Sequence, residues 1–192
     1  MRILGIDPGS RLTGWGLLQR EGSRATWLAS GTLRLDAARP LPERLLQLST
    51  GIAALLDAHR PDACALEQIF TAKNARTALV LGHARGVIVC ALAARGVPIH
   101  EYTPAQVKQA VVGAGRAGKA QVQQMVALLL GLRAGEGPGA RPALQEDEAD
   151  ALAVALTHAA AARVLAAQGA SGAGRGLLQT GGSRAAGWRR PR

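Results

Sequence analysis

The sequence predicts an α/β domain with a five-stranded mixed sheet flanked by helices. Three extended stretches follow one another at the N-terminus, over residues 2–7, about 12–20 and about 24–35, with only short turns between them. An amphipathic stretch then leads into an apolar run at residues 63–67, the pattern of a parallel strand added beside the first. A chain of 192 residues is long enough for one such domain with a substantial core.

The first two strands are joined by a tight turn that begins at an aspartate. The apolar run 3–6 ends at Asp7, Pro8-Gly9-Ser10 turns the chain, and the second extended run starts at Leu12. An Asp before Pro-Gly can simply hydrogen-bond its own backbone. A carboxylate that ends a buried strand is nevertheless costly unless it has a partner. Both interpretations of Asp7 are open at this point.

A helix and a fourth strand follow the three N-terminal strands. Leu41-Pro42-Glu43 begins the helix, with proline in the first turn where its missing N–H costs nothing. Its apolar residues recur every three or four positions until Pro61. The next run is apolar and ends at Glu67, which in a parallel pairing lies at the same sheet edge as Asp7. The alternative is a strand-terminal glutamate that points to solvent.

The next elements are a long helix and a short strand. Asn74 is a good N-cap for a helix over about 75–95, in which Gly82 and Gly86 lie on one face. That spacing permits close helix packing, within the chain or across a dimer seam. Residues 97–99 predict a fifth strand near the sheet edge, because it contains a proline.

A helix over about 105–112, begun by Thr103-Pro104, ends in a glycine-rich segment. Residues 113–120 nearly match a phosphate-binding loop, but position 120 is Ala, so the magnesium-binding hydroxyl is absent. The segment also follows a helix rather than a strand. We therefore interpret it as a connector to a helix that starts at Lys119 and runs through Leu130.

The last helix begins with acidic residues. After a Gly- and Pro-rich loop at 131–145, it starts at Glu146 and runs to about residue 162. Acids at a helix N-terminus are favourable in themselves. Asp147 and Asp150, however, are three apart and share a face, and the residues that follow are apolar. Two carboxylates that enter a core together are hard to explain without a cation.

Four carboxylates thus become candidates for one site: Asp7, Glu67, Asp147 and Asp150. Hard oxygen ligands without a His or Cys cluster favour Mg²⁺ or Mn²⁺ over zinc. Two such ions about 3.5–4 Å apart would act on an attacking water and a departing 3′ oxygen in an in-line phosphoryl displacement.

The charge favours a polyanionic partner. The net charge is +10, and the sequence pI is about 11.3. Residues 163–192 hold six arginines and no acid, so we expect a nuclease-type domain over 1–162 and a basic, Gly/Arg-rich disordered tail over 163–192. Only three of the 23 basic residues are lysines, namely Lys73, Lys108 and Lys119, which marks them as candidate point-charge contacts.

The sequence also indicates a compartment. Cys64 and Cys90 lie in apolar contexts without metal-ligand spacing, as expected in a reducing compartment. The sequence predicts no apolar run long enough to span a bilayer and no secretory signal, so the expected location is the cytoplasm, in association with the nucleoid, with no membrane partner.

Several ordered blocks resemble the bacterial RuvC Holliday-junction resolvase family. They are residues 3–11 with Thr13-Gly14, 66–70 with 72–74, 107–109 with 111–113, and 147–153. The resemblance covers about residues 1–162. It implies a ribonuclease H-like fold, a homodimer, paired symmetric nicks across a four-way DNA junction, and collaboration with the RuvA–RuvB branch-migration complex in DNA recombination and repair.

The resemblance also assigns roles to individual residues. The family's metal carboxylates fall on the four candidates above, with two Mg²⁺ or Mn²⁺ ions per site. Its lysines near the scissile strand match Lys108 and Lys119, the latter with a catalytic role, and its base-stacking aromatic matches Phe70. Phe70, Lys73, Asn74, Arg76, Lys108 and Lys119 are therefore the expected DNA contacts.

Three other functions are compatible with parts of this pattern. A ribonuclease H-like nuclease acting on structured RNA would share the Asp-x-Gly opening. A non-catalytic junction-binding architectural protein would not need all four acids. An actin-like ATPase or sugar kinase would need a duplicated second half, for which 192 residues are too few.

Overall fold

The chain forms the expected five-stranded mixed sheet. The structure, a computed structural model, describes the backbone of residues 1–68, 75–132 and 144–172, and the side chains of these except 163–172. The strands lie in the order β3-β2-β1-β4-β5, with β1, β2 and β3 antiparallel and β4 and β5 added in parallel. They are β1 (Arg2–Asp7), β2 (Leu12–Glu21), β3 (Arg24–Arg34), β4 (Ala63–Glu67) and β5 (Ile99–Tyr102).

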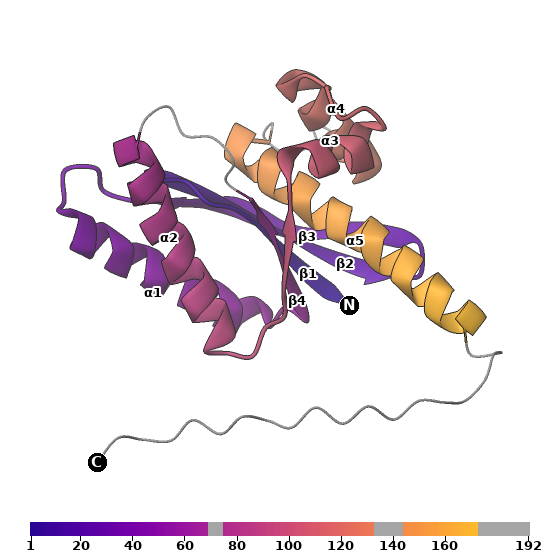
Figure 1. Cartoon of the computed structure of the whole chain (residues 1–192), viewed down its shortest axis with the longest axis horizontal. Helices are drawn as coiled ribbons and strands as arrows, with labels where there is room; N and C mark the ends of the chain where they lie inside the picture. The colour runs from indigo at the N-terminus through magenta and orange to yellow at the C-terminus, as the bar shows by residue number, and fades with distance from the viewer. Residues whose placement is uncertain (69–74, 133–143, 173–192) are drawn as a thin grey trace, which may run out of the picture.

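Helices cover both faces of this sheet (Figure 1). They are α1 (Leu41–His59), α2 (Ala75–Ala93), α3 (Pro104–Val112), α4 (Lys119–Leu129) and α5 (Glu146–Gly172). The period-two alternation of β1 decides which residues meet which helices. Leu4 and Ile6 pack with α1 and α2, whereas Ile3 belongs to the core formed with α5, α3 and α4. The sheet thus lies between one layer formed by α1 and α2 and another formed by α3, α4 and α5.

Two predicted element bounds are wrong. The fifth strand was expected at residues 97–99 but spans Ile99–Tyr102, since Pro98 has no N–H for the ladder and only its carbonyl bonds, to the Cys64 N–H at 2.8 Å. The last helix was expected to end near 162 but continues to Gly172, because Arg163, Leu165, Ala166, Ala167 and Gln168 are all good helix formers. The predicted disorder of 163–192 therefore does not hold for 163–172, and 173–192 lie outside the described residues.

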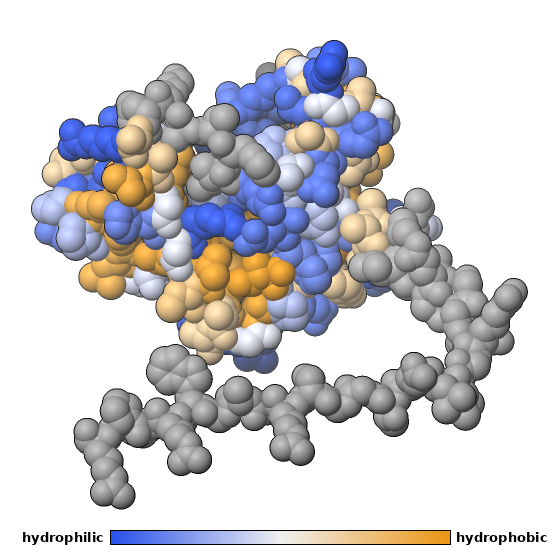
Figure 2. All heavy atoms as spheres, in the orientation of Figure 1, coloured by the Kyte–Doolittle hydropathy of each residue, from blue (hydrophilic) through white to orange (hydrophobic). Residues whose placement is uncertain are grey.

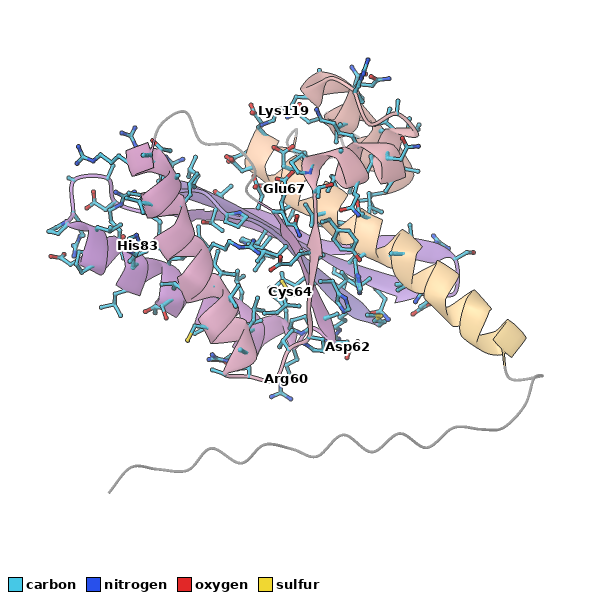
Figure 3. The ribbon with its side chains drawn as sticks, in the orientation of Figure 1. Arg60, Asp62, Cys64, Glu67, His83 and Lys119 are labelled. Atoms are coloured by element: carbon cyan, nitrogen blue, oxygen red, sulfur yellow. The ribbon has the colours of Figure 1, made fainter. Side chains whose placement is uncertain are left out.

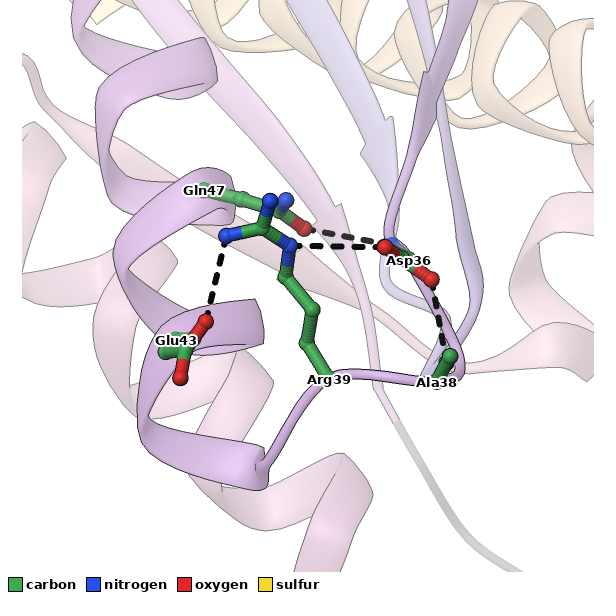
Figure 4. A network of polar contacts seen from close by, with 5 residues as sticks. All are labelled: Asp36, Ala38, Arg39, Glu43 and Gln47. Atoms are coloured by element: carbon green, nitrogen blue, oxygen red, sulfur yellow. Dashed lines mark hydrogen bonds and ion pairs between the residues drawn. The ribbon is translucent and has the colours of Figure 1, made fainter.

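Local polar contacts fix the connections between elements. In the β3–α1 connection, Asp36 accepts hydrogen bonds from the Ala38 N–H at 3.0 Å and from Arg39 Nε at 3.3 Å (Figure 4). Its own N–H donates to Gln47 on α1. At α3, Thr103 forms a full capping box with Gln106, as its position before Pro104 predicted.

Helix α2 is unusual in its exposure. Among the described residues it alone is long and apolar enough to cross a bilayer, and 17% of that span is buried. The expectation of no apolar run of this length overlooked α2, because Arg76 and Arg85 interrupt its apolar sequence. A single helix of this length and composition is weak evidence for a membrane span, so the finding assigns no membrane. Figure 2 shows hydrophobic side chains at the surface around this helix.

Candidate functional site

Asp7 and Glu67 lie at one edge of the sheet, as the sequence predicted. β1 and β4 pair in parallel with Ile6 opposite Leu66, so the next residue of each strand is the carboxylate. Both carboxylates fall on the α5 face, because they follow Ile3 and Ala65 by an even number of residues. Their side chains hydrogen-bond to each other.

Small residues in the sheet bring α5 against these strand ends. A Cβ on Gly14 would lie 1.9 Å from the Asp147 carbonyl oxygen, and one on Gly5 would lie 2.0 Å from that of Ala151. Gly14 is the direct β2 partner of Asp7. The first turn of α5, with Asp147 and Asp150, therefore lies over Asp7 at a distance that only glycine permits.

The carboxylates at this edge of the sheet shift one another's pKa values. Burial raises the pKa of Asp7 to about 8, and the neighbouring charges of Glu67, Asp150 and Asp147 add to the effect. Burial also raises the pKa of Glu67, against the lowering effect of its hydrogen bond with Asp7 and of Lys119 and Lys108. Carboxylates this close repel unless a proton or a cation lies between them. The raised pKa means that Asp7 keeps a proton to a higher pH than an exposed aspartate would.

Lys119 is the cation nearest to the α5 acids. Its Nζ lies 2.9 Å from Asp150 Oδ2 and also pairs with Glu146. Partial burial lowers the pKa of Lys119, but its hydrogen bonds to Glu146 and Asp150 outweigh this and raise it. Burial raises the pKa of Asp150, and the contact with Lys119 opposes that shift.

A pocket of about 160 Å³ opens between α5 and the α3–α4 pair. It is lined by Glu67, Pro104, Val107, Lys108, Lys119, Val122, Asp150 and Ala153. Figure 3 shows Glu67 and Lys119 at this end of the sheet, with Arg60 and Asp62 at the opposite end. Two expected DNA contacts, Lys108 and Lys119, thus share one pocket with two expected metal ligands.

The ligand types of this site suit a hard divalent cation, although the side chains do not lie at coordinating distances from one point. Every candidate ligand is a carboxylate, and the buried Asp7 needs a proton or a cation to offset its neighbours. Across residues 1–68, 75–132 and 144–162, no three His, Cys, Asp or Glu side chains have the spacing of a bound ion. In this structure Asp150 pairs with Lys119 instead.

The other expected DNA contacts are only partly described. Phe70, Lys73 and Asn74 lie outside the described residues. Arg76 is exposed in the first turn of α2 and does not line the pocket.

Sequence reasoning missed several residues that surround the site. Arg85 of α2 donates from Nη1 to the Glu67 carbonyl at 3.1 Å. Ser30 of β3 donates to Glu148 at 3.1 Å and so fastens the first turn of α5 to the sheet. Glu146 pairs with Lys119. One sign of such a contact was present in the sequence, because Arg85 is a charged residue in the middle of an otherwise apolar helix.

A buried histidine lies on the same face, away from the carboxylates. His158 is 3% exposed, its Nδ1 lies 2.7 Å from the Tyr102 hydroxyl, and its ring stacks on His100 at 4.1 Å. Burial lowers its pKa to about 4, with further lowering by His100 and Arg20. This burial and these contacts give His158 a structural role.

Comparison with known proteins gives consistent matches. Residues 3–158 match the family model described as crossover junction endodeoxyribonuclease RuvC. Proteins of that name from Citrifermentans bemidjiense and Sorangium cellulosum are each 48% identical, over 85% and 90% of this chain and 95% and 92% of the relatives.

Solved structures agree with these sequence matches. Thermus thermophilus RuvC in complex with Holliday junction substrate is 36% identical, with a TM-score of 0.75 over 85% of this chain and 96% of that one. The yeast mitochondrial Holliday junction resolvase Ydc2, at 14% identity and a TM-score of 0.58, shares the fold.

Proposed function

Because the chain belongs to the RuvC family of crossover junction endodeoxyribonucleases, we propose that it resolves four-way DNA junctions by paired symmetric nicks in recombination and repair. The observation that carries this proposal is the convergence of Asp7, Glu67 and Asp150 beside Lys108 and Lys119. Carboxylates that repel one another next to two cations suit metal-assisted hydrolysis of a phosphodiester.

Asp7, Glu67, Asp147 and Asp150 would hold two Mg²⁺ or Mn²⁺ ions. When bound, these ions would supply an activated water and charge stabilisation at the leaving 3′ oxygen. The raised pKa of Asp7 supports this assignment, because a cation can replace the proton that the buried carboxyl otherwise keeps. The extra charge of the apo site would also make metal binding stabilise the fold.

The lysines of the pocket would hold the scissile strand. Lys119 now pairs with Asp150, and a DNA phosphate that drew it away would free that carboxylate for metal. Lys108 lines the same pocket and would bind the backbone nearby. Arg76, Phe70, Lys73 and Asn74 are also proposed to contact DNA, with Phe70 stacking on an unpaired base.

We propose a homodimer with α2 as its seam. A Cβ added at Gly82 or Gly86 would meet nothing within 4 Å, so this face of α2 is open within the protomer. Exposed Leu79 and Cys90 extend the same apolar face. Two copies of one patch related by a two-fold axis would cover it.

The seam predicts that Gly82→Leu yields monomers. A leucine there would prevent close approach of the two α2 helices without a clash inside the protomer. Light scattering measures the outcome, with Ala54→Leu on the exposed side of α1 as the matched control. A dimer that survives Gly82→Leu would contradict this seam.

Cellular partners follow from the family and the charge. The RuvA–RuvB complex is the proposed source of the junction, and the cytoplasm near the nucleoid is the proposed location. The basic segment 163–192 would add sequence-independent phosphate attraction, which weakens as salt rises.

Substrate competition tests the proposed function. Unlabelled four-way DNA, duplex DNA and structured RNA are added in turn to a nicking reaction on a labelled junction with Mg²⁺. We expect only the four-way DNA to compete strongly, with cuts at symmetric positions on opposing strands. Stronger competition by RNA would favour an RNA nuclease, and tight junction binding without cuts would favour an architectural protein.

A further inference from the structure

Arg85 connects α2 to the backbone of a proposed metal ligand. Its guanidinium donates from Nη1 to the Glu67 carbonyl oxygen at 3.1 Å and pairs through Nη2 with Glu101 on β5. The second carboxylate oxygen of Glu101 accepts a hydrogen bond from Gln68 Nε2 at 3.4 Å. Arg85 thus bonds Glu67, the last residue of β4, and its partner Glu101 bonds Gln68, the next residue of the chain.

Glu67 needs such support because it is where the chain leaves the sheet. Its neighbour Leu66 pairs with Glu101, and Glu67 itself pairs with Tyr102, whose carbonyl accepts from the Gln68 N–H at 2.8 Å. The β1 ladder on the other side of β4 ends with Ile6 opposite Leu66, so at Glu67 the described strand pairing is with β5 alone, an edge strand of four residues. Arg85 adds a further restraint on Glu67, from the helix layer.

This contact differs from an ordinary surface ion pair. Exposed pairs contribute little, and the same helix region offers one for comparison, Arg95 with Asp57. The side chain of Arg95 is 35% exposed and joins only another side chain, whereas that of Arg85 is 22% exposed and also bonds a main-chain carbonyl. The planar fork of arginine makes both contacts at once, which lysine does not.

We propose that Arg85 is a positioning residue for the nicking reaction, which holds the end of β4 so that the Glu67 carboxylate faces Asp7 and the proposed metal ions. The inference rests on the proposed function of the Glu67 site. It also connects the two proposed roles of α2, because the helix whose outer face carries the dimer seam fixes Glu67 from its inner face.

The test compares Arg85→Gln and Arg85→Lys with Arg95→Gln, which removes an arginine–carboxylate pair remote from Glu67. Calorimetry with Mn²⁺ on the DNA-free protein measures metal affinity. Nicking of a labelled four-way junction is titrated with Mg²⁺, and junction binding is measured in Ca²⁺. We expect Arg85→Gln to weaken Mn²⁺ binding and raise the half-maximal Mg²⁺ concentration about tenfold, as for other supports of metal ligands.

Junction affinity should stay at the wild-type value, Arg85→Lys should recover part of the loss, and Arg95→Gln should match wild type. Equal Mn²⁺ affinity in Arg85→Gln and Arg95→Gln would overturn the inference. If Arg85→Gln does not fold, Glu101→Gln removes the charge partner instead, and wild-type Mn²⁺ affinity in that variant would overturn the inference. A wild-type protein that binds Mn²⁺ but nicks no junction would refute the proposed function, while the Mn²⁺ comparison still decides the role of Arg85.

Discussion

Asp7→Asn should make the metal-free protein more stable, although it removes a proposed metal ligand. In the fold, burial and three neighbouring acids raise the pKa of Asp7 to about 8, whereas an unfolded Asp loses its proton near 3.8. A group with a raised folded-state pKa contributes stability that is present below pH 3.8 and lost as the pH rises through 8. The wild-type protein therefore loses stability across this range, and Asn avoids that loss.

The structure sets the size of the effect. Holding the proton on Asp7 costs about 1.4 kcal/mol for each pH unit above 3.8, or at most about 3 kcal/mol at pH 6 and about 6 kcal/mol at pH 8. Water entry and movement of α5 relieve part of this. Asn matches the shape of the protonated acid and can donate the same hydrogen bond to Glu67. We expect a gain of about 2–4 kcal/mol at pH 8, or about 5–10 °C in Tm.

Urea unfolding followed by circular dichroism, in EDTA at pH 6 and pH 8, measures the difference. Asp57→Asn is the control, because Asp57 is exposed and its hydrogen bond with Arg95 lowers its pKa. The gain from Asp7→Asn should be larger at pH 8 than at pH 6 and should shrink when Mg²⁺ is added. An Asp7→Asn variant no more stable than wild type at pH 8 in EDTA would refute the reasoning.

Three further predictions concern single side chains. Lys119→Ala should lower nicking about tenfold to a hundredfold with an unchanged Tm in Mg²⁺, and a large fall in Tm would instead indicate a structural role. Phe70→Ala should keep junction binding but slow cleavage, since base stacking is worth about 1–3 kcal/mol, and unchanged cleavage would argue against stacking. Because the pKa of His158 is about 4 in the fold and 6.5 when unfolded, the neutral ring contributes to the free energy of unfolding above pH 6.5. This contribution, at most about 3 kcal/mol, is lost as the pH falls through 4. In urea unfolding, His158→Gln should remove this fall in unfolding free energy at low pH, whereas the exposed control His83→Gln should keep it. An unfolding free energy of His158→Gln that falls with pH as in the wild type would contradict the prediction.

The sequence predicted those site features that follow from local pattern. Two apolar runs that each end in an acid predict two carboxylates at one sheet edge once the strands are parallel, and Asp7 and Glu67 do lie there. Thr103 before Pro104 predicted a helix start, and the capping box forms. These predictions succeed because each depends on residues that are neighbours in the chain or on a period of two.

Other features depend on contacts between distant segments. The closeness of α5 to the sheet comes from Gly5 and Gly14, which sequence alone presents as ordinary strand or turn glycines. The bond of Arg85 to the Glu67 carbonyl joins residues 18 apart through the packing of α2 on the sheet. The true end of α5 was missed because Gly169 and Gly172 lower the helix propensity of this stretch, although Leu165, Ala166 and Gln168 favour helix.

The most direct test of the central claim, a carboxylate metal site that nicks four-way DNA, is cleavage of a labelled junction by wild type, Glu67→Gln and Asp150→Asn in Mg²⁺. These substitutions keep the side-chain shape and remove one charge each. We predict symmetric cuts on opposing strands by wild type only, with junction binding intact in all three. A variant that binds the junction and cuts it at the wild-type rate would contradict the claim.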